Sequence, residues 1–396
     1  MGIVVQKYGG SSVADPKRMG EVADRVAQTR ASGKDVVVVV SAMGDTTDDL
    51  LALSRTVTDS PPRRELDMLL SAGERISMAL LSMALNARNV AAVSFTGSQS
   101  GIITNDAHTN ARILEVRPYR VQDELSRGKV VIVAGYQGVS YKKDVTTLGR
   151  GGSDTTAVAL AAALGAEACE IYSDVAGVYS ADPRVVPDAV RLAELSYDEM
   201  QELARCGARV LNAQAVEFAR DRDIVLYARA ASGETGETVI RRSTSRPGAG
   251  AVGVAGETGL VLLQAPDGLT FSRLIAALVA RDIPTKETLT NSSGEGAVLL
   301  SLENVHDFAA LERALRQEVG DRLSLRAGLG AVSVVGTSVG ASPRALGRAL
   351  AVLSAAGLAA VAASATGARL SVLVEGDVIA EATRLLHAAF VGAPQT

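Results

Sequence analysis

Residues 3–12 read IVVQKYGGSS, in which a short apolar run passes directly into two glycines and two serines. A helical pattern follows, and it begins at Asp15, an N-capping residue ahead of a proline suited to the first helical position. The apolar residues Met19, Val22 and Val26 then recur on one helical face. A strand, a glycine turn and an amphipathic helix in this order indicate the first unit of an α/β fold.

The same alternation of apolar runs and helical patterns continues to about residue 240. Several of the runs are unbroken series of valine and isoleucine, which favours parallel strands covered on both faces. We therefore predict one domain over residues 1–242, built on a doubly wound and mainly parallel α/β sheet. Its strands are expected at residues 3–7, 35–41, 91–96, 129–135, 168–173 and 224–228.

The rest of the chain repeats a βαββαβ pattern twice, at a spacing of roughly 70 residues. We predict a linker rich in glycine and proline at residues 243–256, followed by two ferredoxin-like modules at residues 257–328 and 329–396. The second copy lacks a last strand, which we expect residues 251–255 of the linker to supply. A single irregular α+β domain is the alternative, and the shared element order of the two copies disfavours it.

The composition argues against several classes of partner. The formal net charge is −4 and no strongly basic stretch occurs, so a nucleic-acid partner is not expected. No signal-peptide pattern is visible, and the strongly apolar run near the start is far shorter than the ~20 residues of a membrane helix. We therefore expect a cytoplasmic protein without membrane contact. The 2 cysteines and 3 histidines are scattered, which argues against a protein metal site.

Two glycine-rich segments carry the strongest chemical signals. Residues 147–156 read TLGRGGSDTT ahead of a helical pattern, and three glycines in four positions are hard to explain by packing alone. Within this segment Arg150 can pair with a carboxylate, and Asp154 can bind an ammonium group or orient a lysine. In the KYGGSS segment, Lys7, two glycines and a helix N-terminus can hold phosphate oxygens. Neither segment matches the P-loop or the dinucleotide-binding fingerprint.

Three weaker segments also have ordinary structural explanations. Residues 41–47, SAMGDTT, place hydroxyl groups at the end of a strand, where open α/β sheets bind ligands, but the same groups can cap the next helix. Glu74 lies in an apolar helical stretch and needs a partner, either a substrate amine or Arg75. Residues 173–179, SDVAGVY, can frame a nucleotide base or form a plain turn.

Taken together and in this order, the segments resemble the aspartate kinases of the amino-acid kinase family over about residues 1–240. The motifs that carry the resemblance are KYGGSS, VVVSAMGDTT, GERIS, GYQG, TLGRGGSDTTA, SDVAGVYSADPR and LSYDEMQELARCGARVL. The two C-terminal modules are similar to the paired ACT domains with which these enzymes sense amino acids. The resemblance implies phosphorylation of the β-carboxylate of L-aspartate by ATP and Mg²⁺, giving 4-phospho-L-aspartate on the route to lysine, methionine and threonine.

The resemblance also implies a role for each matching residue. Lys7, Arg150 and Asp154 would be catalytic, with Lys7 at the transferring phosphoryl group, and no side chain is assigned as a direct metal ligand. The residues expected to hold aspartate are Ser41, Thr47, Glu74, Arg150, Ser153 and Asp154. The residues expected to surround ATP are Lys7, Gly9, Gly10, Ser11, Ser173, Asp174, Tyr179, Arg184 and Arg209.

Some positions depart from the family pattern. Ala176 stands where aspartate is usual and Arg209 where lysine is usual, which bears on nucleotide binding. The effector segment of the first module usually contains Gln-Asn but here reads Leu289-Thr290-Asn291, so we expect weakened feedback inhibition by lysine and threonine. A homodimer or higher homo-oligomer through the ACT modules is expected. The alternatives are an amino-acid sensor of this fold without turnover, and a kinase for another amino-acid carboxylate in a specialised pathway.

Overall fold

The chain divides into two compact units, each with its own main sheet. The computed structural model describes residues 2–149, 151–245, 250–305 and 307–392. Unit 1 comprises Met1–Tyr179, Arg191–Ala204 and Arg209–Arg246. Unit 2 comprises Ser180–Val190, Arg205–Ala208 and Pro247–Thr396. Two short segments that precede residue 209 in the sequence therefore belong to the second unit.

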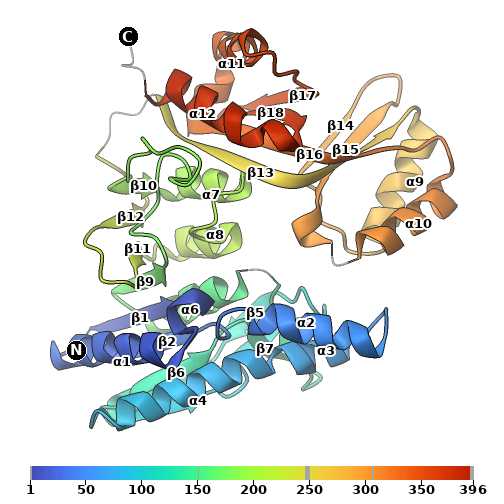
Figure 1. The fold of residues 1–396 in the computed structure, drawn as a ribbon. Coiled ribbons are helices and arrows are strands. Elements are labelled where there is room, and N and C mark those ends of the chain that lie inside the picture. Colours follow the sequence, from blue (N-terminus) through green and yellow to red (C-terminus); the bar gives the residue numbers. More distant parts are fainter. Residues whose placement is uncertain (1, 150, 246–249, 306, 393–396) are drawn as a thin grey trace. The chain divides into compact units, whose positions relative to one another are not determined.

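The main sheet of unit 1 has the strand order β10-β12-β11-β9-β1-β2-β6-β3 among the described residues (Figure 1). Every neighbouring pair is parallel except β11 with β12. The mainly parallel α/β sheet predicted from the sequence is confirmed. Its strands are β1 (Ile3–Tyr8), β2 (Asp35–Val40), β3 (Ala92–Phe95), β6 (Val130–Ala134), β9 (Ala168–Ser173), β10 (Glu194–Ser196), β11 (Leu226–Ala230) and β12 (Glu237–Arg241).

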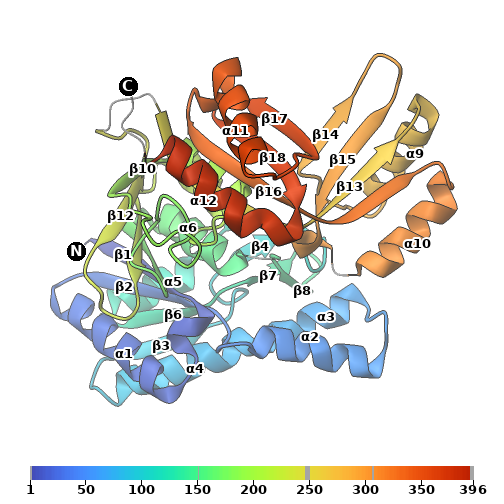
Figure 2. The same cartoon turned by 45° about the horizontal axis from the view of Figure 1, so that its top comes forward.

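Helices cover both faces of this sheet, which is why its central strands are apolar throughout (Figure 2). The valines of β2 that point to α1 (Pro16–Ala31) and α4 (Ala72–Asn86) share one buried cluster with them. The alternate valines of β2 are equally buried, on the face of α6 (Gly152–Leu164). Each such side chain stabilises the fold by about 1.5–3 kcal/mol when removed from water. The other helices are α2 (Thr46–Val57), α3 (Arg63–Leu70), α5 (Tyr119–Ser126), α7 (Tyr197–Arg205) and α8 (Ala213–Arg222).

The start of α1 follows the sequence signal. The Asp15 carboxylate accepts a hydrogen bond of 2.9 Å from the backbone N–H of Arg18, and Pro16 is the first helical residue. The cap satisfies one of the free donors of the first turn, and the proline has no N–H to leave unpaired. A short 3₁₀ turn at Gly10–Val13 precedes this cap, so the glycines of KYGGSS lie between β1 and α1.

A second sheet of unit 1 was not predicted. It has the order β5-β4-β7-β8 within the described residues. Its strands have only three or four residues and carry little apolar alternation, so the sequence pattern does not reveal them. They are β4 (Ile102–Thr104), β5 (Ile113–Val116), β7 (Gln137–Ser140) and β8 (Val145–Thr147).

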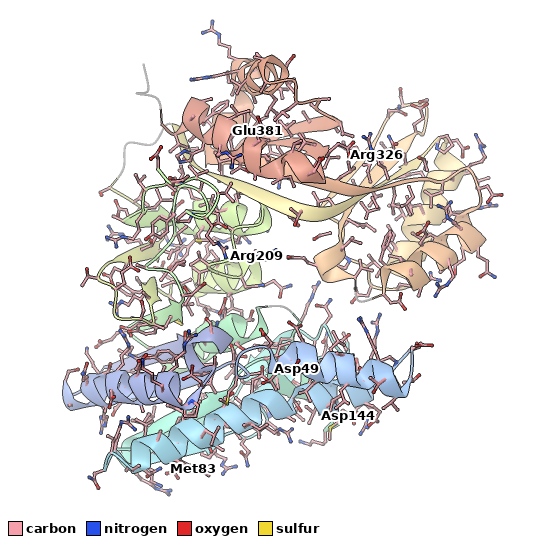
Figure 3. The ribbon with its side chains drawn as sticks, in the orientation of Figure 1. Asp49, Met83, Asp144, Arg209, Arg326 and Glu381 are labelled. Atoms are coloured by element: carbon pink, nitrogen blue, oxygen red, sulfur yellow. The ribbon has the colours of Figure 1, made fainter. Side chains whose placement is uncertain are left out.

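One helical stretch in the described part of the chain, Arg63–Asn86, has the length and hydropathy of a membrane span. It consists of α3 and α4. Leu81 and Leu85 of α4 are fully buried in the cluster that packs on the sheet, whereas Met83 is 66% exposed (Figure 3). A core helix of a folded domain passes the same test of length and composition, and the packing of α4 is of that kind.

Unit 2 contains one antiparallel sheet with the order β14-β15-β13-β16-β18-β17, counted over the described residues. The two ferredoxin-like modules are confirmed, but they are not separate. The strand expected at 251–255 and the first strand of the first module are parts of one strand, β13 (Gly250–Ala265). The last strand of the first module likewise continues into the first strand of the second module as β16 (Ser324–Thr337). The other strands are β14 (Glu287–Thr290), β15 (Gly296–Ser301), β17 (Ala362–Thr366) and β18 (Arg369–Glu375).

The long strands β13 and β16 pair with each other along most of their lengths and so join the modules. Residues 253–255 pair with residues 333–335, which completes the second module. The helices pack on one face of this sheet in two apolar clusters, one for each module. They are α9 (Gly268–Val279), α10 (Phe308–Val319), α11 (Pro343–Ala355) and α12 (Ile379–Phe390).

Candidate active site

The carboxyl ends of the central strands β9, β1, β2 and β6 lie next to one another because these strands are parallel. Ligands of open α/β sheets bind beyond this edge. Most of the residues predicted to bind aspartate or phosphate follow these strands or begin the helices above them. Backbone hydrogen bonds join the loops: Gly9 N donates to Tyr172 O at 3.2 Å, Ser41 N to Tyr8 O at 3.1 Å, and Gly135 N to Val40 O at 3.0 Å.

A buried ion pair lies at the centre of this edge. The Lys7 ammonium of β1 is 2.7 Å from a carboxylate oxygen of Asp154 in the first turn of α6, and the two side chains are 13% and 9% exposed. The other carboxylate oxygen of Asp154 accepts a hydrogen bond from the backbone N–H of Asn212 at 3.2 Å. The structure therefore brings together two residues that lie almost 150 positions apart in the sequence. Asp154 fixes the position of a cation that is available to an anionic ligand.

Gly10 is required by a close approach of two loops. A Cβ atom at this position would lie 2.9 Å from the carbonyl oxygen of Ala42, and Gly44 N donates a hydrogen bond of 3.1 Å to Gly10 O. A Cβ at Gly9 would lie 3.7 Å from the Lys7 ammonium nitrogen. The backbone of the KYGGSS turn thus passes directly beside the lysine. That arrangement suits a phosphate group held by backbone N–H groups and one cation.

Glu74 is a buried carboxylate, and such a group needs hydrogen-bond donors or a cation beside it. It lies in the first turn of α4, is 3% exposed, and accepts a hydrogen bond of 3.2 Å from the backbone N–H of Ala42. Its second oxygen is buried and has no hydrogen-bond partner among the described residues. Burial raises the pKa of Glu74 to about 7. Arg75, the alternative partner, donates instead to Gln137 at 3.4 Å, so a ligand cation is the remaining candidate.

Small polar groups surround these charges. Ser153 is buried, and its hydroxyl would lie 2.7 Å from a Cβ at Gly135, so the glycine lets this serine approach the end of β6. Ser41 follows β2 and is half-buried, as is Thr47 in the first turn of α2. Gly151, with φ of 69°, turns the chain into α6. The predicted carboxylate partner, Arg150, lies outside the described residues.

The residues predicted to surround ATP are less closely gathered. The Ser173 hydroxyl accepts a hydrogen bond of 3.3 Å from the backbone N–H of Val175, within the turn after β9, and Asp174 is exposed. Tyr179 forms an isolated β-bridge with Arg191. Ser11 is exposed at the KYGGSS turn.

The structure also describes the two departures from the family pattern and one further arginine. Ala176 is fully buried. Arg209 lies between α7 and α8 of unit 1 (Figure 3). Arg184 belongs to unit 2, where its guanidinium pairs with Asp182 at 2.8 Å and its side chain is 79% exposed.

One buried polar cluster of unit 1 was not predicted from the sequence. Asp67 of α3 is completely buried and accepts hydrogen bonds from His108, Thr109 and Thr147. These partners come from three separate segments, and no motif links them. The one available signal was a charged residue between two buried leucines, Leu66 and Leu70, of an amphipathic helix. Among the described residues, no group of three or more His, Cys, Asp or Glu could hold a metal ion.

Comparison with known sequences identifies the family to which this chain is similar. The Amino acid kinase family model matches residues 2–227. An aspartokinase of Mycolicibacterium smegmatis is 44% identical over 98% of this chain and 96% of its own length. An aspartokinase of Corynebacterium glutamicum is 56% identical over 61% of this chain and 58% of its own length.

Two solved structures of a relative have the same fold as this chain. Escherichia coli aspartokinase III in complex with aspartate and ADP (R-state) matches with a TM-score of 0.85 at 25% identity, over 98% of this chain and 99% of that one. The same enzyme in complex with lysine and aspartate (T-state) matches with a TM-score of 0.73 at 26% identity, over 98% and 99%. The chain therefore belongs to the amino acid kinase family, and within it to the aspartokinases.

Proposed function

We propose that this chain transfers the γ-phosphoryl group of ATP to the β-carboxylate of L-aspartate and releases ADP and 4-phospho-L-aspartate. The observation that supports this most is the buried Lys7–Asp154 pair at the ends of the central strands. It supplies a fixed cation where phosphate would bind. The E. coli relative that matches this chain was solved with aspartate and ADP, the acceptor and a product of this reaction.

The acceptor would be held by complementary charges. Glu74 offers a buried carboxylate oxygen that has no hydrogen-bond partner among the described residues, and an α-ammonium group would satisfy it. Asp154 adds a second negative charge, and the hydroxyls of Ser41, Thr47 and Ser153 can bind the carboxylates of the substrate. We assign Arg150 to a substrate carboxylate on the basis of its position in the motif. This pattern of charges favours a compact α-amino acid over an N-acylated one, whose nitrogen carries no charge.

Transfer needs positioning and charge stabilisation rather than a covalent protein intermediate. A β-carboxylate oxygen forms a bond to the γ-phosphorus while the bond from that phosphorus to the bridging β–γ oxygen breaks. The electron pair leaves with ADP. Lys7 and the N–H group of Gly10 would stabilise the negative charge on the moving phosphoryl group, and Gly9 would line its path. Ser11, Ser173, Asp174, Tyr179 and Arg209 are proposed to bind the rest of the nucleotide.

Mg²⁺ would be held mainly by the phosphate oxygens of ATP. No side chain is assigned as a direct ligand to this ion, which would arrive with the nucleotide. When bound, the ion neutralises part of the phosphate charge. Lys7 and the glycine turn would then orient the γ-phosphoryl group toward the acceptor.

We assign catalysis to residues 1–242 and regulation to the modules at 257–328 and 329–396. A cavity of about 450 Å³ in the first module is lined by residues that include Leu289, Asn291, Glu295 and Arg322. An amino-acid effector is the proposed ligand, because the E. coli relative was also solved with lysine. A cytoplasmic homodimer or higher homo-oligomer is the proposed state of the protein.

The test is an acyl-phosphate trap. The purified protein is incubated with Mg-ATP and hydroxylamine, with L-aspartate, L-glutamate, N-acetylglutamate or no acceptor. Hydroxylamine converts an acyl phosphate into a coloured hydroxamate. We expect signal with L-aspartate alone. Signal with another acid would show that the enzyme phosphorylates a different substrate. No signal with any acceptor, from folded protein, would contradict the proposal and favour a sensor without turnover.

A further inference from the structure

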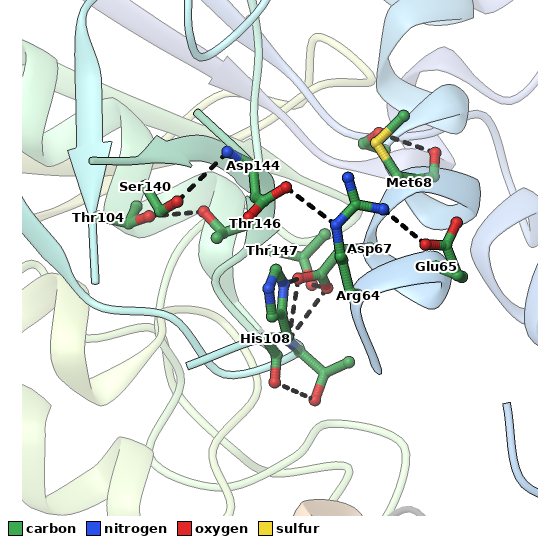
Figure 4. Close-up of polar contacts among 12 residues, drawn as sticks. Arg64, Glu65, Asp67, Met68, Thr104, His108, Ser140, Asp144, Thr146 and Thr147 are labelled. Carbon is green, nitrogen blue, oxygen red and sulfur yellow. Dashed lines mark hydrogen bonds and ion pairs between the residues drawn. The ribbon is translucent and has the colours of Figure 1, made fainter. Parts of the chain in front are cut away.

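The carboxylate of Asp67 is the meeting point of three segments of unit 1 (Figure 4). One oxygen accepts hydrogen bonds from the Thr147 hydroxyl at 2.6 Å and the backbone N–H of Thr109 at 3.0 Å. The other oxygen is 2.6 Å from Nδ1 of His108 and 3.2 Å from the same N–H. Asp67 itself is 0% exposed, and the His108 side chain is 18% exposed. The carboxylate thus ties α3 to the loop before β5 and to the last residue of β8.

The two segments tied by Asp67 also contact each other. The carbonyl of Thr147 accepts a hydrogen bond of 2.8 Å from the backbone N–H of Ala111. Two residues later, Gly149 has φ of 74°, and a Cβ there would lie 3.1 Å from the side-chain oxygen of Asn110. The loop that holds His108 therefore packs directly on the strand end from which the glycine-rich loop departs. A shift of either segment would move the other.

The strand end at Thr147 leads straight into the proposed aspartate site. Leu148 N donates a hydrogen bond of 2.9 Å to Tyr136 O. After Gly151, the chain enters α6, whose first turn carries Ser153 and Asp154. Thr147 is thus the last residue with a side-chain anchor before the loop. The anchor lies a few residues from groups that must meet the substrate to within about half an ångström.

Burying the Asp67 carboxylate costs free energy unless hydrogen bonds compensate for the lost hydration. Burial raises the pKa of Asp67, while the hydrogen bonds from Thr147, His108 and Thr109 oppose the rise. The cation drawn with it in Figure 4, Arg64, pairs with Glu65 and Asp144 instead. The donors from Thr109, Thr147 and His108 therefore make the site tolerable for an ionised group. Three donors converging on one carboxylate also leave it a single geometry.

We propose that Asp67, together with His108, is a positioning residue for the acceptor: it fixes Thr147 and through it the start of α6, so that Ser153 and Asp154 meet L-aspartate in the reactive geometry. This rests on the proposed function for the identity of the substrate. Neither residue needs to touch the substrate. Loss of the anchor should loosen the acceptor site more than the nucleotide site.

The most direct variants change one hydroxyl. Thr147→Val keeps the shape of the side chain and removes its bond to Asp67, whereas Thr147→Ser keeps the bond. We expect Thr147→Val to raise the KM for L-aspartate about tenfold, with the KM for ATP changed less than about twofold. Thr147→Ser should restore the wild-type KM. The matched control is Thr104→Val, which removes a buried hydroxyl that bonds Thr146 at 2.6 Å in the same small sheet.

A second pair of variants tests the same anchor at a residue where a substitution should disturb the fold less. His108 is partly exposed, whereas Asp67 is completely buried. His108→Ala removes the donor, and His108→Asn replaces Nδ1 with an amide nitrogen. We expect the alanine variant to behave like Thr147→Val and the asparagine variant to recover most of the affinity. Equal KM increases for L-aspartate and ATP, or no rescue by serine and asparagine, would overturn the proposal in favour of a purely structural role.

Hydrogen exchange separates this inference from the proposed reaction. In the absence of substrates, the amides of residues 147–156 should exchange faster in Thr147→Val than in the wild type or in Thr104→Val. That result would support the anchor even if L-aspartate proved not to be the acceptor. Unchanged exchange in that segment would contradict the anchor whatever the substrate.

Discussion

The two main sheets differ in how they distribute their strand ends. In unit 1 the central strands β9, β1, β2 and β6 are parallel, so their carboxyl ends and the following loops meet along one edge. In unit 2 every neighbouring pair is antiparallel, so successive strands end on opposite edges. Only the parallel arrangement gathers Lys7, Ser41 and Ser173 from distant parts of the sequence. The comparison gives a physical reason for proposing the chemistry in unit 1 and ligand sensing in unit 2.

The largest expected effect tests whether that edge carries the reaction. Lys7→Ala should lower kcat by at least ~10²-fold, by analogy with the removal of one donor that stabilises transition-state charge. The matched control is Lys34→Ala, which removes a lysine that pairs with Glu167 on the surface of the same unit. The kcat of each variant is measured by steady-state kinetics and compared with that of the wild type.

Equal kcat values for the two lysine variants would remove Lys7 from the mechanism. A loss in both would indicate damage to the fold, which the thermal unfolding of each variant measures directly. A loss confined to Lys7→Ala would tie turnover to the parallel edge.

The second effect concerns the buried carboxylate of Glu74 at the same edge. The pKa of Glu74 is raised to about 7 by burial, so the folded state holds its proton more tightly than the unfolded state does. Without substrate, stability should therefore fall as pH rises from about 4.5 to 7, by about 3 kcal/mol in total. Glu74→Gln should remove this loss and be more stable than the wild type at pH 8.

The same substitution should harm substrate binding. The ionised form of Glu74 is the one that attracts an ammonium group, so the KM for L-aspartate in the wild type should rise as pH falls below about 7. In Glu74→Gln the KM should be about tenfold higher or more at pH 8 and lose most of this pH dependence. A variant that is destabilised at pH 8, or that binds L-aspartate normally, would contradict the assigned role.

The third prediction addresses the antiparallel unit. Because Leu289 and Thr290 depart from the usual effector segment and line the cavity of the first module, we expect millimolar lysine and threonine together to change kcat/KM for L-aspartate less than about twofold. The activity is measured with each amino acid alone and with both. If the pair abolishes activity, weakened feedback is the wrong expectation and the changed segment still recognises its effectors.

The sequence was most informative where the pattern is regular. The valine run of β2 and the Asp15 cap of α1 predicted their elements correctly, because burial on both faces and helix capping each leave a local signature. The small second sheet of unit 1 was missed, because its strands have three or four residues. The continuity of β13 and β16 was also missed, because glycines at 256, 259, 328 and 330 interrupt the apolar pattern without ending the strands.

The candidate site shows the same limit. Sequence motifs identified Lys7, Glu74 and Asp154, because each lies in a distinctive local pattern. The Lys7–Asp154 contact was foreseen only as one option, since a motif does not state which residue it will meet. The Asp67 cluster was not foreseen at all, because its geometry depends on tertiary pairing across 80 residues. Buried charges reveal themselves in a sequence only when the neighbours that satisfy them are also local.

The smallest expected effect is on the pH dependence of stability, which should differ between the two units. In unit 2, Nε2 of His387 is 2.9 Å from the Ser180 hydroxyl, whose oxygen also accepts a hydrogen bond of 3.0 Å from the backbone N–H of Val190. When the hydroxyl donates its proton to the histidine, His387 must be neutral at Nε2 to accept it. Burial lowers the pKa of His387, and the charge of Asp188 only partly opposes this.

The sign of the pH effect is opposite to that of Glu74. Since the folded-state pKa of His387 lies below its unfolded value of about 6.5, the unfolded state binds the proton more readily, and the contribution to stability is lost as pH falls below about 6.5. His387→Gln keeps an acceptor without a titrating group, so its thermal unfolding should be less sensitive to pH between 7.5 and 5.5 than that of the wild type. Ser180→Ala should weaken the same pH dependence, because the partner that favours neutral His387 is gone. If acid destabilises all three proteins equally, His387 is not the group that makes unit 2 sensitive to acid, and the opposed pH responses of the two units disappear.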